Sequence, residues 1–171
     1  MITKSFNFRL MTESDFPLMF DWLNRPHVAE IWDGPMTQNQ VIERYKKNIQ
    51  DPNIFCFIVE YKNKPIGYIQ NYNANLVGDG WWPGEPKGTW GVDQFIGEED
   101  LIGKGLGSLF VQEFSDQMLN SSQVNRVITD PAPQNSKAIR AYEKAGFTKL
   151  GIIQTPDGPA QLMEKSRNEK V

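Results

Sequence analysis

Residues 135–147 read NSKAIRAYEKAGF, and their spacing predicts an amphipathic helix. Tyr142 stands three and four residues after Ile139 and Ala138, so these three side chains lie on one face of that helix. Gly146 follows the last periodic residue and predicts a left-handed cap at the end of the helix. Tyr142 therefore has two interpretations: it packs in the core, or it presents its hydroxyl group to a functional site.

Hydrophobic periodicity in the rest of the chain predicts a mixed α/β fold. Alternating or continuous apolar runs predict strands over residues 6–12, 53–61, 65–73, 89–97, 124–130, 147–155 and 160–166. Helical spacing predicts helices over residues 12–24, 37–49 and, after a glycine-rich turn, within 102–119, with loops at 25–35 and 76–88. Thr12 or Ser14 is expected to cap the first helix, and Thr37 the second. Because a hairpin run is combined with βαβ units, we expect one mixed sheet with helices on both faces, folded as a single domain over residues 1–171.

Composition and charge restrict the classes of partner. The 171 residues include 23% charged and 39% hydrophobic residues, as in ordinary globular proteins, and the formal net charge is −3. Because no basic patch is present, nucleic acid and anionic membranes are not expected as partners, whereas a cationic ligand is compatible with the charge. No segment resembles a leader or a membrane span, so we expect a cytoplasmic protein.

The few metal-binding and nucleophilic residues exclude several kinds of site. Cys56 is the single cysteine, so no intramolecular disulfide is possible, and its apolar neighbours predict a buried thiol. One cysteine and one histidine do not make a zinc site, and no metal is expected. A serine–histidine–aspartate triad would require His27, which has no nucleophile motif near it and is expected to be a surface or packing residue.

A glycine-rich turn, GKGLG at residues 103–107, lies between a predicted strand and a predicted helix. Glycines let backbone N–H groups converge, and the positive end of a helix dipole adds to them, so such a turn suits a pyrophosphate. The same pattern is also typical of a turn that binds nothing. Neither the Walker spacing nor the dinucleotide-binding spacing G-x-G-x-x-G is present.

Together, IGKGLG and NSKAIRAYEKAGF resemble the GNAT family of N-acetyltransferases. The family's acetyl-CoA motif, Q/R-x-x-G-x-G/A, is matched except at its opening position, where Ile102 stands. Its later motif, N-x-x-A-x-x-x-Y-x-x-x-G-F, is matched in full by Asn135, Ala138, Tyr142, Gly146 and Phe147. Further segments, notably GDGWW and TPDGPA, are similar to aminoglycoside 6′-N-acetyltransferases. The resemblance implies the GNAT fold and transfer of an acetyl group from acetyl-CoA to the 6′-amino group of an aminoglycoside, which confers resistance.

The resemblance also implies which residues bind acetyl-CoA. Backbone amides of the glycine-rich turn would hold the pyrophosphate, and the preceding strand would lie beside the pantetheine arm. The residues expected to contact the co-substrate are Phe95, Ile96, Lys104, Gly105, Leu106, Gly107, Ser108, Asn135 and Ala138.

A polycationic acceptor calls for acidic and aromatic side chains. Trp81 and Trp82 lie in a predicted loop, where contact with sugar rings or cations explains them better than core packing. Trp32, Gln70 and Tyr72 are candidates for the same wall, with core packing an equal alternative. Aspartates at predicted strand ends and loops are individually typical of turns, but in segments that match the family they are expected to line one acceptor site. These aspartates are Asp79, Asp93, Asp130 and Asp157.

Two residues are expected to act on protons. A lysine-like amine has a pKa of about 10.4, so a carboxylate is a poor direct base for it. Asp93 is therefore expected to act through a water and mainly to stabilise charge. The departing thiolate has a pKa near that of cysteine, about 8.5, and a phenol at about 10 is close enough to protonate it. The resemblance places Tyr142 beside the thioester sulfur, which makes Tyr142 the expected general acid.

Two other functions fit the same residues. A related acetyltransferase could act on a protein N-terminus, a lysine side chain or a small polyamine-like amine, because acidic loops also suit those acceptors. A non-catalytic sensor could bind acyl-CoA without turnover, although the presence of both Tyr142 and Asp93 argues against it. The protein is expected to act as a monomer or a homodimer.

Overall fold

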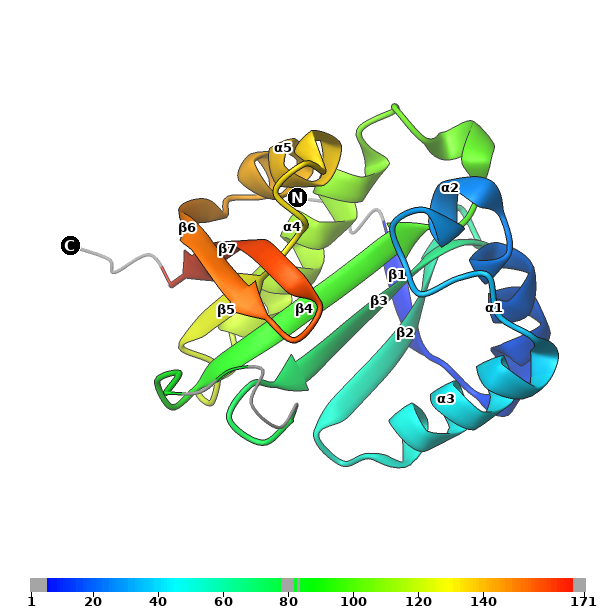
Figure 1. Ribbon diagram of the computed structural model, residues 1–171, viewed down its shortest axis with the longest axis horizontal. Coiled ribbons are helices and arrows are strands. Elements are labelled where there is room, and N and C mark those ends of the chain that lie inside the picture. The colour runs from blue at the N-terminus through cyan, green and yellow to red at the C-terminus, as the bar shows by residue number, and fades with distance from the viewer. Residues whose placement is uncertain (1–5, 78–81, 83, 168–171) are drawn as a thin grey trace. The chain divides into compact units, whose positions relative to one another are not determined.

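The computed structural model describes residues 6–77, 82 and 84–167 (Figure 1). The chain divides into two compact units: the first comprises Met1–Gln70 and Gln94–Leu106, and the second comprises Asn71–Asp93 and Gly107–Val171. Each division of the chain falls within an element, namely strand β3 (Lys64–Asn73), strand β4 (Thr89–Ile96) and helix α4 (Leu106–Leu119). The expected single domain stays a prediction.

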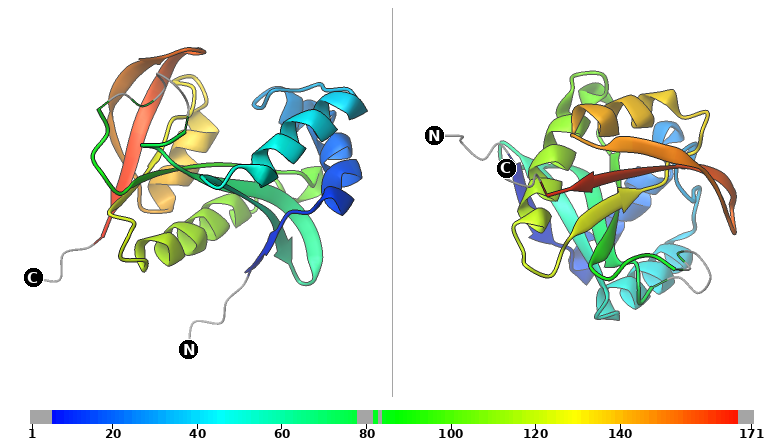
Figure 2. Two further views of the ribbon diagram at one scale, coloured as in Figure 1. Left: turned by 90° about the horizontal axis from the view of Figure 1, so that it is seen from below. Right: turned by 90° about the vertical axis from the view of Figure 1, so that its left-hand side faces the viewer.

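The first unit consists of strands and the helices that pack on them (Figure 2). Helix α1 contacts α3, and α3 contacts strand β2. Strand β1 pairs antiparallel with β2, with Phe6 opposite Tyr61. The predicted strands and both predicted helices of this unit are confirmed. In chain order the elements are β1 (Phe6–Leu10), the 3₁₀ helix η1 (Glu13–Asp15), α1 (Phe16–Leu23), α2 (Pro26–Ala29), α3 (Gln38–Gln50), β2 (Ile54–Tyr61), most of β3, the end of β4 and the 3₁₀ helix η2 (Glu99–Leu101).

Local sequence signals explain where α3 begins and how β2 turns into β3. The hydroxyl group of Thr37 accepts a hydrogen bond from the Gln40 backbone N–H at 3.2 Å, and Gln40 Oε1 accepts one from the Thr37 N–H at 2.8 Å. This reciprocal pair satisfies two N–H groups at the start of the helix and confirms the predicted cap. Lys62 and Asn63 have φ angles of 50° and 63°, which suit the tight turn of a hairpin.

Aromatic and apolar side chains fill the core of the first unit. Met19, Trp22 and Leu23 of α1 are fully buried and belong to one cluster with Tyr68 of β3 and Phe95 of β4. The rings of Tyr68 and Phe95 stack with their centroids 5.5 Å apart. Burial of each such side chain stabilises the fold by about 1.5–3 kcal/mol, so the core holds these segments of β3 and β4 firmly in place.

The second unit carries the stretch 135–147 as helix α5, which contacts strand β6 (Figure 2). Asn135 caps α5, because its side-chain oxygen accepts a hydrogen bond from the Ala138 backbone N–H at 3.2 Å. Gly146 has a φ angle of 102°, so the predicted helix and its left-handed end are confirmed. In chain order the elements are the end of β3, the start of β4, α4, β5 (Arg126–Thr129), α5 (Ser136–Lys144), β6 (Thr148–Thr155) and β7 (Gly158–Ser166).

Among the described residues, seven strands are hydrogen-bonded in the order β1-β2-β3-β4-β5-β7-β6. Strands β4 and β5 are parallel, whereas β7 is antiparallel to both of its neighbours. The predicted mixed sheet is therefore confirmed. Strand β4 pairs with β5 through Thr89, Trp90 and Gly91. Since β5 ends at Thr129 and β4 continues to Ile96, the last residues of β4 extend past this pairing.

Three elements differ from the prediction, and one of them is the 3₁₀ helix η2 (Glu99–Leu101), in a stretch for which no element was expected. The segment 25–35, expected to be a loop, contains the four-residue helix α2, with Pro26 at its first position. One helical turn is too short to show periodicity in a sequence, which explains the error. Strand β7 begins at Gly158, inside the expected turn, because Thr155 pairs with Gly158 at the end of the hairpin.

Candidate active site

The hydroxyl group of Tyr72 is the centre of a polar cluster in the second unit. Tyr72 lies on β3 and is only 8% exposed. A Cβ atom added at Gly91 of β4 would lie 2.1 Å from Cζ and 2.4 Å from the hydroxyl oxygen of Tyr72. The phenol ring of Tyr72 therefore fits here because Gly91 has no side chain. This contact also places the hydroxyl group against β4, two residues before Asp93.

Side chains from several elements act on this hydroxyl group. Burial raises the pKa of Tyr72 well above its usual value, and the negative charges of Asp93 and Asp130 raise it further. A hydrogen bond with Trp82 opposes these effects, and Tyr142 also contributes to the shift. Because an indole N–H can only donate, the Tyr72 oxygen accepts from Trp82. We call these five residues the Tyr72 cluster. The phenol at its centre stays protonated at neutral pH.

The strand register explains why Asp93 and Asp130 lie at the same end of β4 and β5. Gly91 is the last residue of β4 paired with β5, and its partner is Ile128. Asp93 stands two residues after Gly91, and Asp130 stands two residues after Ile128, both half-buried. Since β4 and β5 are parallel, equal steps along both strands bring Asp93 and Asp130 to the same end of the pair. Two negative charges at one place favour a cationic ligand.

Tyr142 reaches the cluster from α5. It is 5% exposed, and its ring meets Phe147 edge-on with centroids 5.5 Å apart. The Phe147 backbone N–H donates to the Tyr142 carbonyl oxygen at 3.0 Å, just beyond the positive φ angle of Gly146. Asn135 and Ala138, both expected to bind the co-substrate, form the cap of this helix. Residues of the family motif therefore fix the position of Tyr142.

Trp82 is more enclosed than its loop sequence suggests. Its side chain is 7% exposed, whereas the sequence analysis found core packing a poor explanation for it. The hydrogen bond to Tyr72 supplies the physical reason, because a buried indole N–H requires an acceptor. Asp79 and Trp81, which were expected to join the same acceptor wall, lie outside the described residues.

Ion pairs and hydrogen bonds anchor the end of the Trp82 loop. The Asn75 side chain donates to the Glu85 carbonyl oxygen at 2.8 Å. Arg126, at the start of β5, bonds to the carboxylate of Glu85 and, at 2.9 Å, to that of Glu164 on β7. These side chains are largely buried, so the loop joins β4 at a fixed place.

Asp157 lies in the turn between β6 and β7. Its backbone N–H donates to Thr155 Oγ1 at 3.2 Å, and the Thr155 hydroxyl group donates to the Gly158 carbonyl oxygen at 2.8 Å. These bonds hold the turn, while the residue itself is exposed. A role of Asp157 in acceptor binding stays a prediction.

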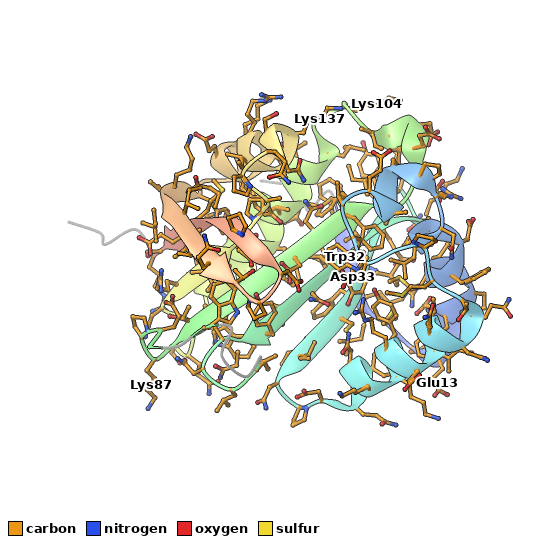
Figure 3. The ribbon with its side chains drawn as sticks, viewed as in Figure 1. Glu13, Trp32, Asp33, Lys87, Lys104 and Lys137 are labelled. Atoms are coloured by element: carbon orange, nitrogen blue, oxygen red, sulfur yellow. The ribbon has the colours of Figure 1, made fainter. Side chains whose placement is uncertain are left out.

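Three further predicted site residues lie in the first unit. The indole N–H of Trp32, whose side chain is labelled in Figure 3, donates to the Tyr45 hydroxyl oxygen at 3.2 Å. Its ring packs edge-on against Tyr68 and Phe95. Gln70 Oε1 accepts a hydrogen bond from the Tyr68 hydroxyl group at 2.7 Å. Phe95 is 1% exposed, so its side chain belongs to the core. The expected place of Phe95 beside a pantetheine arm stays a prediction, and with the side chain buried it would involve the backbone.

The glycine-rich turn has backbone conformations that favour glycine. Gly103 and Gly105 have φ angles of 79° and 77°, which residues with side chains rarely adopt. A Cβ atom added at either position would have no atom within 4 Å, so open space faces the turn. Lys104 between them is exposed (Figure 3). Helix α4 begins at Leu106, and its positive dipole end adds to the attraction for an anion.

The described residues also bear on three other features: a metal site, a membrane-spanning helix and a reactive cysteine. No group of three or more histidine, cysteine, aspartate or glutamate side chains among them could hold a metal ion. None of the helices in the described ranges is long and apolar enough to cross a membrane. Cys56 is buried, and burial raises the pKa of its thiol, which makes it a poor nucleophile.

Comparison with known proteins assigns a family to this arrangement. Residues 11–155 match the family model described as an acetyltransferase (GNAT) domain. The chain belongs to the GNAT family of acetyltransferases. In this GNAT acetyltransferase, the two motifs of the sequence correspond to the open glycine-rich turn and to the helix that presents Tyr142.

Several relatives carry names that refer to aminoglycosides or to kanamycin. This GNAT acetyltransferase is 40% identical over 168 residues to aminoglycoside N(6′)-acetyltransferase type 1 from Klebsiella pneumoniae, a match that covers 95% of this chain and 84% of the relative. It is 43% identical over 88 residues to a kanamycin resistance protein from Rhizobium radiobacter, covering 51% of this chain and 82% of that protein. A crystal structure of aminoglycoside acetyltransferase AAC(6′)-Ib with coenzyme A and kanamycin has a TM-score of 0.90 and 41% identity, covering 95% of both chains.

The sequence analysis missed Gly91 and the central place of Tyr72. A glycine inside a predicted strand signals that another group approaches closely, and this signal was available at Gly91. Tyr72 was only one of several candidates for the acceptor wall, because nothing local in the sequence distinguishes a tyrosine beside two carboxylates from one in an apolar core.

Proposed function

We propose that this GNAT acetyltransferase transfers the acetyl group of acetyl-CoA to the 6′-amino group of an aminoglycoside and thereby confers resistance to that antibiotic. The observation that carries the proposal is the pair of aspartates, Asp93 and Asp130, at the same end of the parallel strands β4 and β5, both of which raise the pKa of the buried Tyr72. The relative named for 6′-acetylation, at 40% identity, supports the choice of acceptor.

Negative charge in the second unit favours a polycationic acceptor. Asp93 and Asp130 stand at the same end of β4 and β5, where their combined field would hold an ammonium group. Asp157 offers a further exposed carboxylate, and the resemblance adds Asp79. The formal net charge of −3 acts in the same direction over longer distances.

The reaction forms a bond between the amine nitrogen and the acetyl carbonyl carbon and breaks the carbon–sulfur bond of the thioester. An amine with a pKa of about 10.4 must first lose a proton, which at pH 7 costs about 4.6 kcal/mol. Because a carboxylate is a poor direct base for such an amine, a water carries the proton towards Asp93. The charge of Asp93 also stabilises the positive nitrogen that forms on attack, until that nitrogen releases its second proton through water to solvent.

The sulfur leaves with the electron pair of the carbon–sulfur bond and takes a proton from the hydroxyl group of Tyr142, and solvent then returns a proton to Tyr142. The products are the N-acetylated amine and coenzyme A. Tyr72 is a poor alternative acid, because its pKa is raised well above the usual value by burial, Asp93 and Asp130. A phenol so weakly acidic is badly matched to a thiolate whose pKa is about 8.5.

Turnover with different amines tests the proposal directly. Release of the coenzyme A thiol is followed with acetyl-CoA and either kanamycin, spermidine or a lysine peptide as acceptor. We expect kcat/KM to be about a hundredfold higher or more for kanamycin, because a site built for one polar acceptor discriminates strongly against others. A higher kcat/KM for spermidine or the peptide would favour another amine as the substrate. Binding of acetyl-CoA without thiol release would favour the sensor.

The remaining expectations belong to the same proposal. We place the reaction in the cytoplasm, where acetyl-CoA is available, and we expect a monomer or a homodimer. Sedimentation of the purified protein over a range of concentrations measures the assembly directly.

A further inference from the structure

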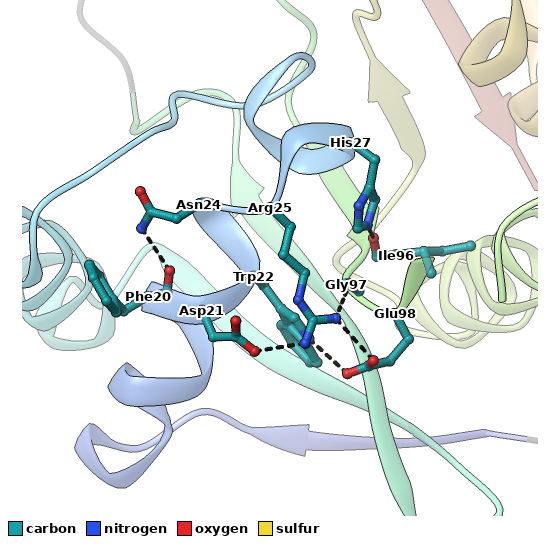
Figure 4. Close-up of polar contacts among 9 residues, drawn as sticks. All are labelled: Phe20, Asp21, Trp22, Asn24, Arg25, His27, Ile96, Gly97 and Glu98. Carbon is teal, nitrogen blue, oxygen red and sulfur yellow. Dashed lines mark hydrogen bonds and ion pairs between the residues drawn. The ribbon is translucent and has the colours of Figure 1, made fainter. Parts of the chain in front are cut away.

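In the first unit, three side chains form hydrogen bonds to three consecutive residues at and just after the end of β4 (Figure 4). The side chains are those of Trp22, Arg25 and His27, and the consecutive residues are Ile96, Gly97 and Glu98. His27 Nε2 lies 3.0 Å from the carbonyl oxygen of Ile96. Arg25 Nη1 donates to the carbonyl oxygen of Gly97 at 2.9 Å. Since a carbonyl oxygen can only accept, Nε2 of His27 carries a proton. These bonds join segments that are about 70 residues apart in the chain, as the separations of 69 and 72 residues show.

Glu98 completes the attachment through its carboxylate. Trp22 Nε1 donates to Oε1 at 3.0 Å, and Arg25 Nη1 donates to Oε2 at 3.0 Å. Burial acts to raise the pKa of Glu98, but the hydrogen bonds from Trp22 and Arg25 lower it below its usual range, so Glu98 is ionised. Arg25 also pairs with Asp21 at 2.7 Å. Arg25 therefore uses its guanidinium group on two carboxylates and one backbone carbonyl at once.

The backbone of Gly97 is fixed from both sides. A Cβ atom added at Gly97 would lie 2.3 Å from ring atoms of Trp22, so the Gly97 backbone packs directly against the indole ring. On the sheet side, the Gly97 and Glu98 N–H groups both donate to the Ile66 carbonyl oxygen, at 2.8 and 3.3 Å. Because peptide groups are planar, fixing these carbonyl oxygens also fixes the directions of the neighbouring N–H groups.

This fixed point lies directly before the glycine-rich turn. Helix η2 starts after Glu98, and the Leu101 N–H donates to the Glu98 carbonyl oxygen at 3.1 Å. Gly103 and Gly105, with positive φ angles, follow within a few residues. The position of Glu98 therefore sets where the turn begins, and the bonds of the two preceding peptide groups to His27, Arg25 and Ile66 hold Glu98 in that position.

We infer that Arg25 and His27 are positioning residues for acetyl-CoA, which hold the end of β4 and the start of the glycine-rich turn in the conformation that binds the co-substrate. The inference rests on the proposed use of acetyl-CoA, and it is independent of which amine is acetylated. Neither residue needs to touch the co-substrate, because both act through Ile96, Gly97 and Glu98. Their loss should appear in acetyl-CoA binding and not in acceptor binding.

A matched pair of substitutions at His27 tests the inference. In His27→Gln the side-chain amide nitrogen can reach the place of Nε2, whereas in His27→Asn the shorter side chain cannot reach the Ile96 carbonyl oxygen. We expect His27→Asn and Arg25→Gln to raise the Kd and KM for acetyl-CoA about tenfold, as the loss of a well-placed hydrogen bond does. His27→Gln should stay within about threefold of the wild type. The KM for the acceptor and kcat at saturating acetyl-CoA should change little in all three variants.

Lys46→Gln is the control, because Lys46 forms an exposed ion pair with Glu13 in the same unit, at 3.6 Å, and should leave both KM values unchanged. Calorimetric titration with acetyl-CoA alone gives Kd well below each melting temperature, so that lower stability is not mistaken for weaker binding. Equal affinity of His27→Asn and the wild type, or equal losses in His27→Asn and His27→Gln, would overturn the inference. If the wild type binds acetyl-CoA but acetylates a different amine, the aminoglycoside proposal fails while this inference stands. A wild type that does not bind acetyl-CoA would overturn both.

Discussion

The phenol ring of Tyr72 occupies the space that a side chain at Gly91 would need. A Cβ atom at Gly91 would lie 2.1 Å from Cζ of Tyr72, closer than non-bonded carbon atoms approach. An alanine there must displace the ring or bend β4. Either movement disturbs the Tyr72 hydroxyl group, which bonds to Trp82 and whose pKa Asp93 and Asp130 raise.

Gly91→Ala should therefore lower the free energy of unfolding by about 1–3 kcal/mol, the usual cost of overpacking. In the double variant Gly91→Ala, Tyr72→Ala the clash is gone. The loss of unfolding free energy in the double variant should then be smaller than the sum of the two single losses by about 1 kcal/mol or more. Urea unfolding of the wild type, both single variants and the double variant measures this coupling. Strictly additive effects would show that Tyr72 does not pack against Gly91 as described.

Gly105→Val should weaken acetyl-CoA binding by about tenfold or more, because the family resemblance includes Gly105, and not Gly103, among the residues that contact the co-substrate. Gly103→Val is a matched control for backbone strain, since the two glycines have φ angles of 79° and 77° and neither added Cβ would have a neighbour within 4 Å. We expect the control to stay within about threefold of the wild type by calorimetric titration. Equal losses of acetyl-CoA affinity in both variants would mean that backbone strain alone weakens binding, and that Gly105 does not contact the co-substrate.

Asp157→Asn should raise the KM for an aminoglycoside by about twofold to fivefold at low salt, as expected for an exposed charge contact. The effect should shrink as salt is added, because ions screen exposed charges over about 10 Å at 0.1 M. The KM for acetyl-CoA should not change. Initial rates at low and high salt check this prediction. An acceptor KM that is unaffected at low salt would remove Asp157 from the acceptor site.

Tyr142→Phe should lower kcat about a hundredfold or more, within the usual range for loss of a general acid. Acetyl-CoA binding should stay near that of the wild type, because the loss belongs to the transition state. A thioester with a more acidic thiol should partly restore the rate. Tyr72→Phe is the matched control from the same cluster, and its kcat should fall much less. A Tyr142→Phe enzyme with full kcat, or one impaired equally for every thiol, would exclude Tyr142 as the acid.

Much of the fold could be predicted because its signals are local. The capping box joins Thr37 to Gln40, and the positive φ angle of Gly146 depends on that glycine and its neighbours. Both features can therefore be predicted from a short stretch of sequence. Helix α2 was missed because a single turn leaves no periodic pattern. Strand and helix boundaries otherwise follow the hydrophobic spacing.

The candidate site could be predicted only in part, because its contacts join distant segments. Asp93, Asp130 and Tyr142 were predicted as site residues, but the place of the two aspartates depends on the register of β4 against β5, and that of Tyr72 on the space at Gly91. No local pattern encodes that register. The bond of His27 to Ile96 was not predicted either, because it joins segments 69 residues apart. From the sequence, His27 was expected to be a surface or packing residue.

Acetylation of the 6′-amino group is the central claim, and a pair of acceptors tests it most directly. The two aminoglycosides should be identical except that one carries an amino group at the 6′ position and the other a hydroxyl group. Thiol release from acetyl-CoA is measured for each under the same conditions. We expect rapid thiol release with the 6′-amine and none above background with the 6′-hydroxyl compound. Equal turnover of both compounds, or no turnover of the 6′-amine, would contradict it.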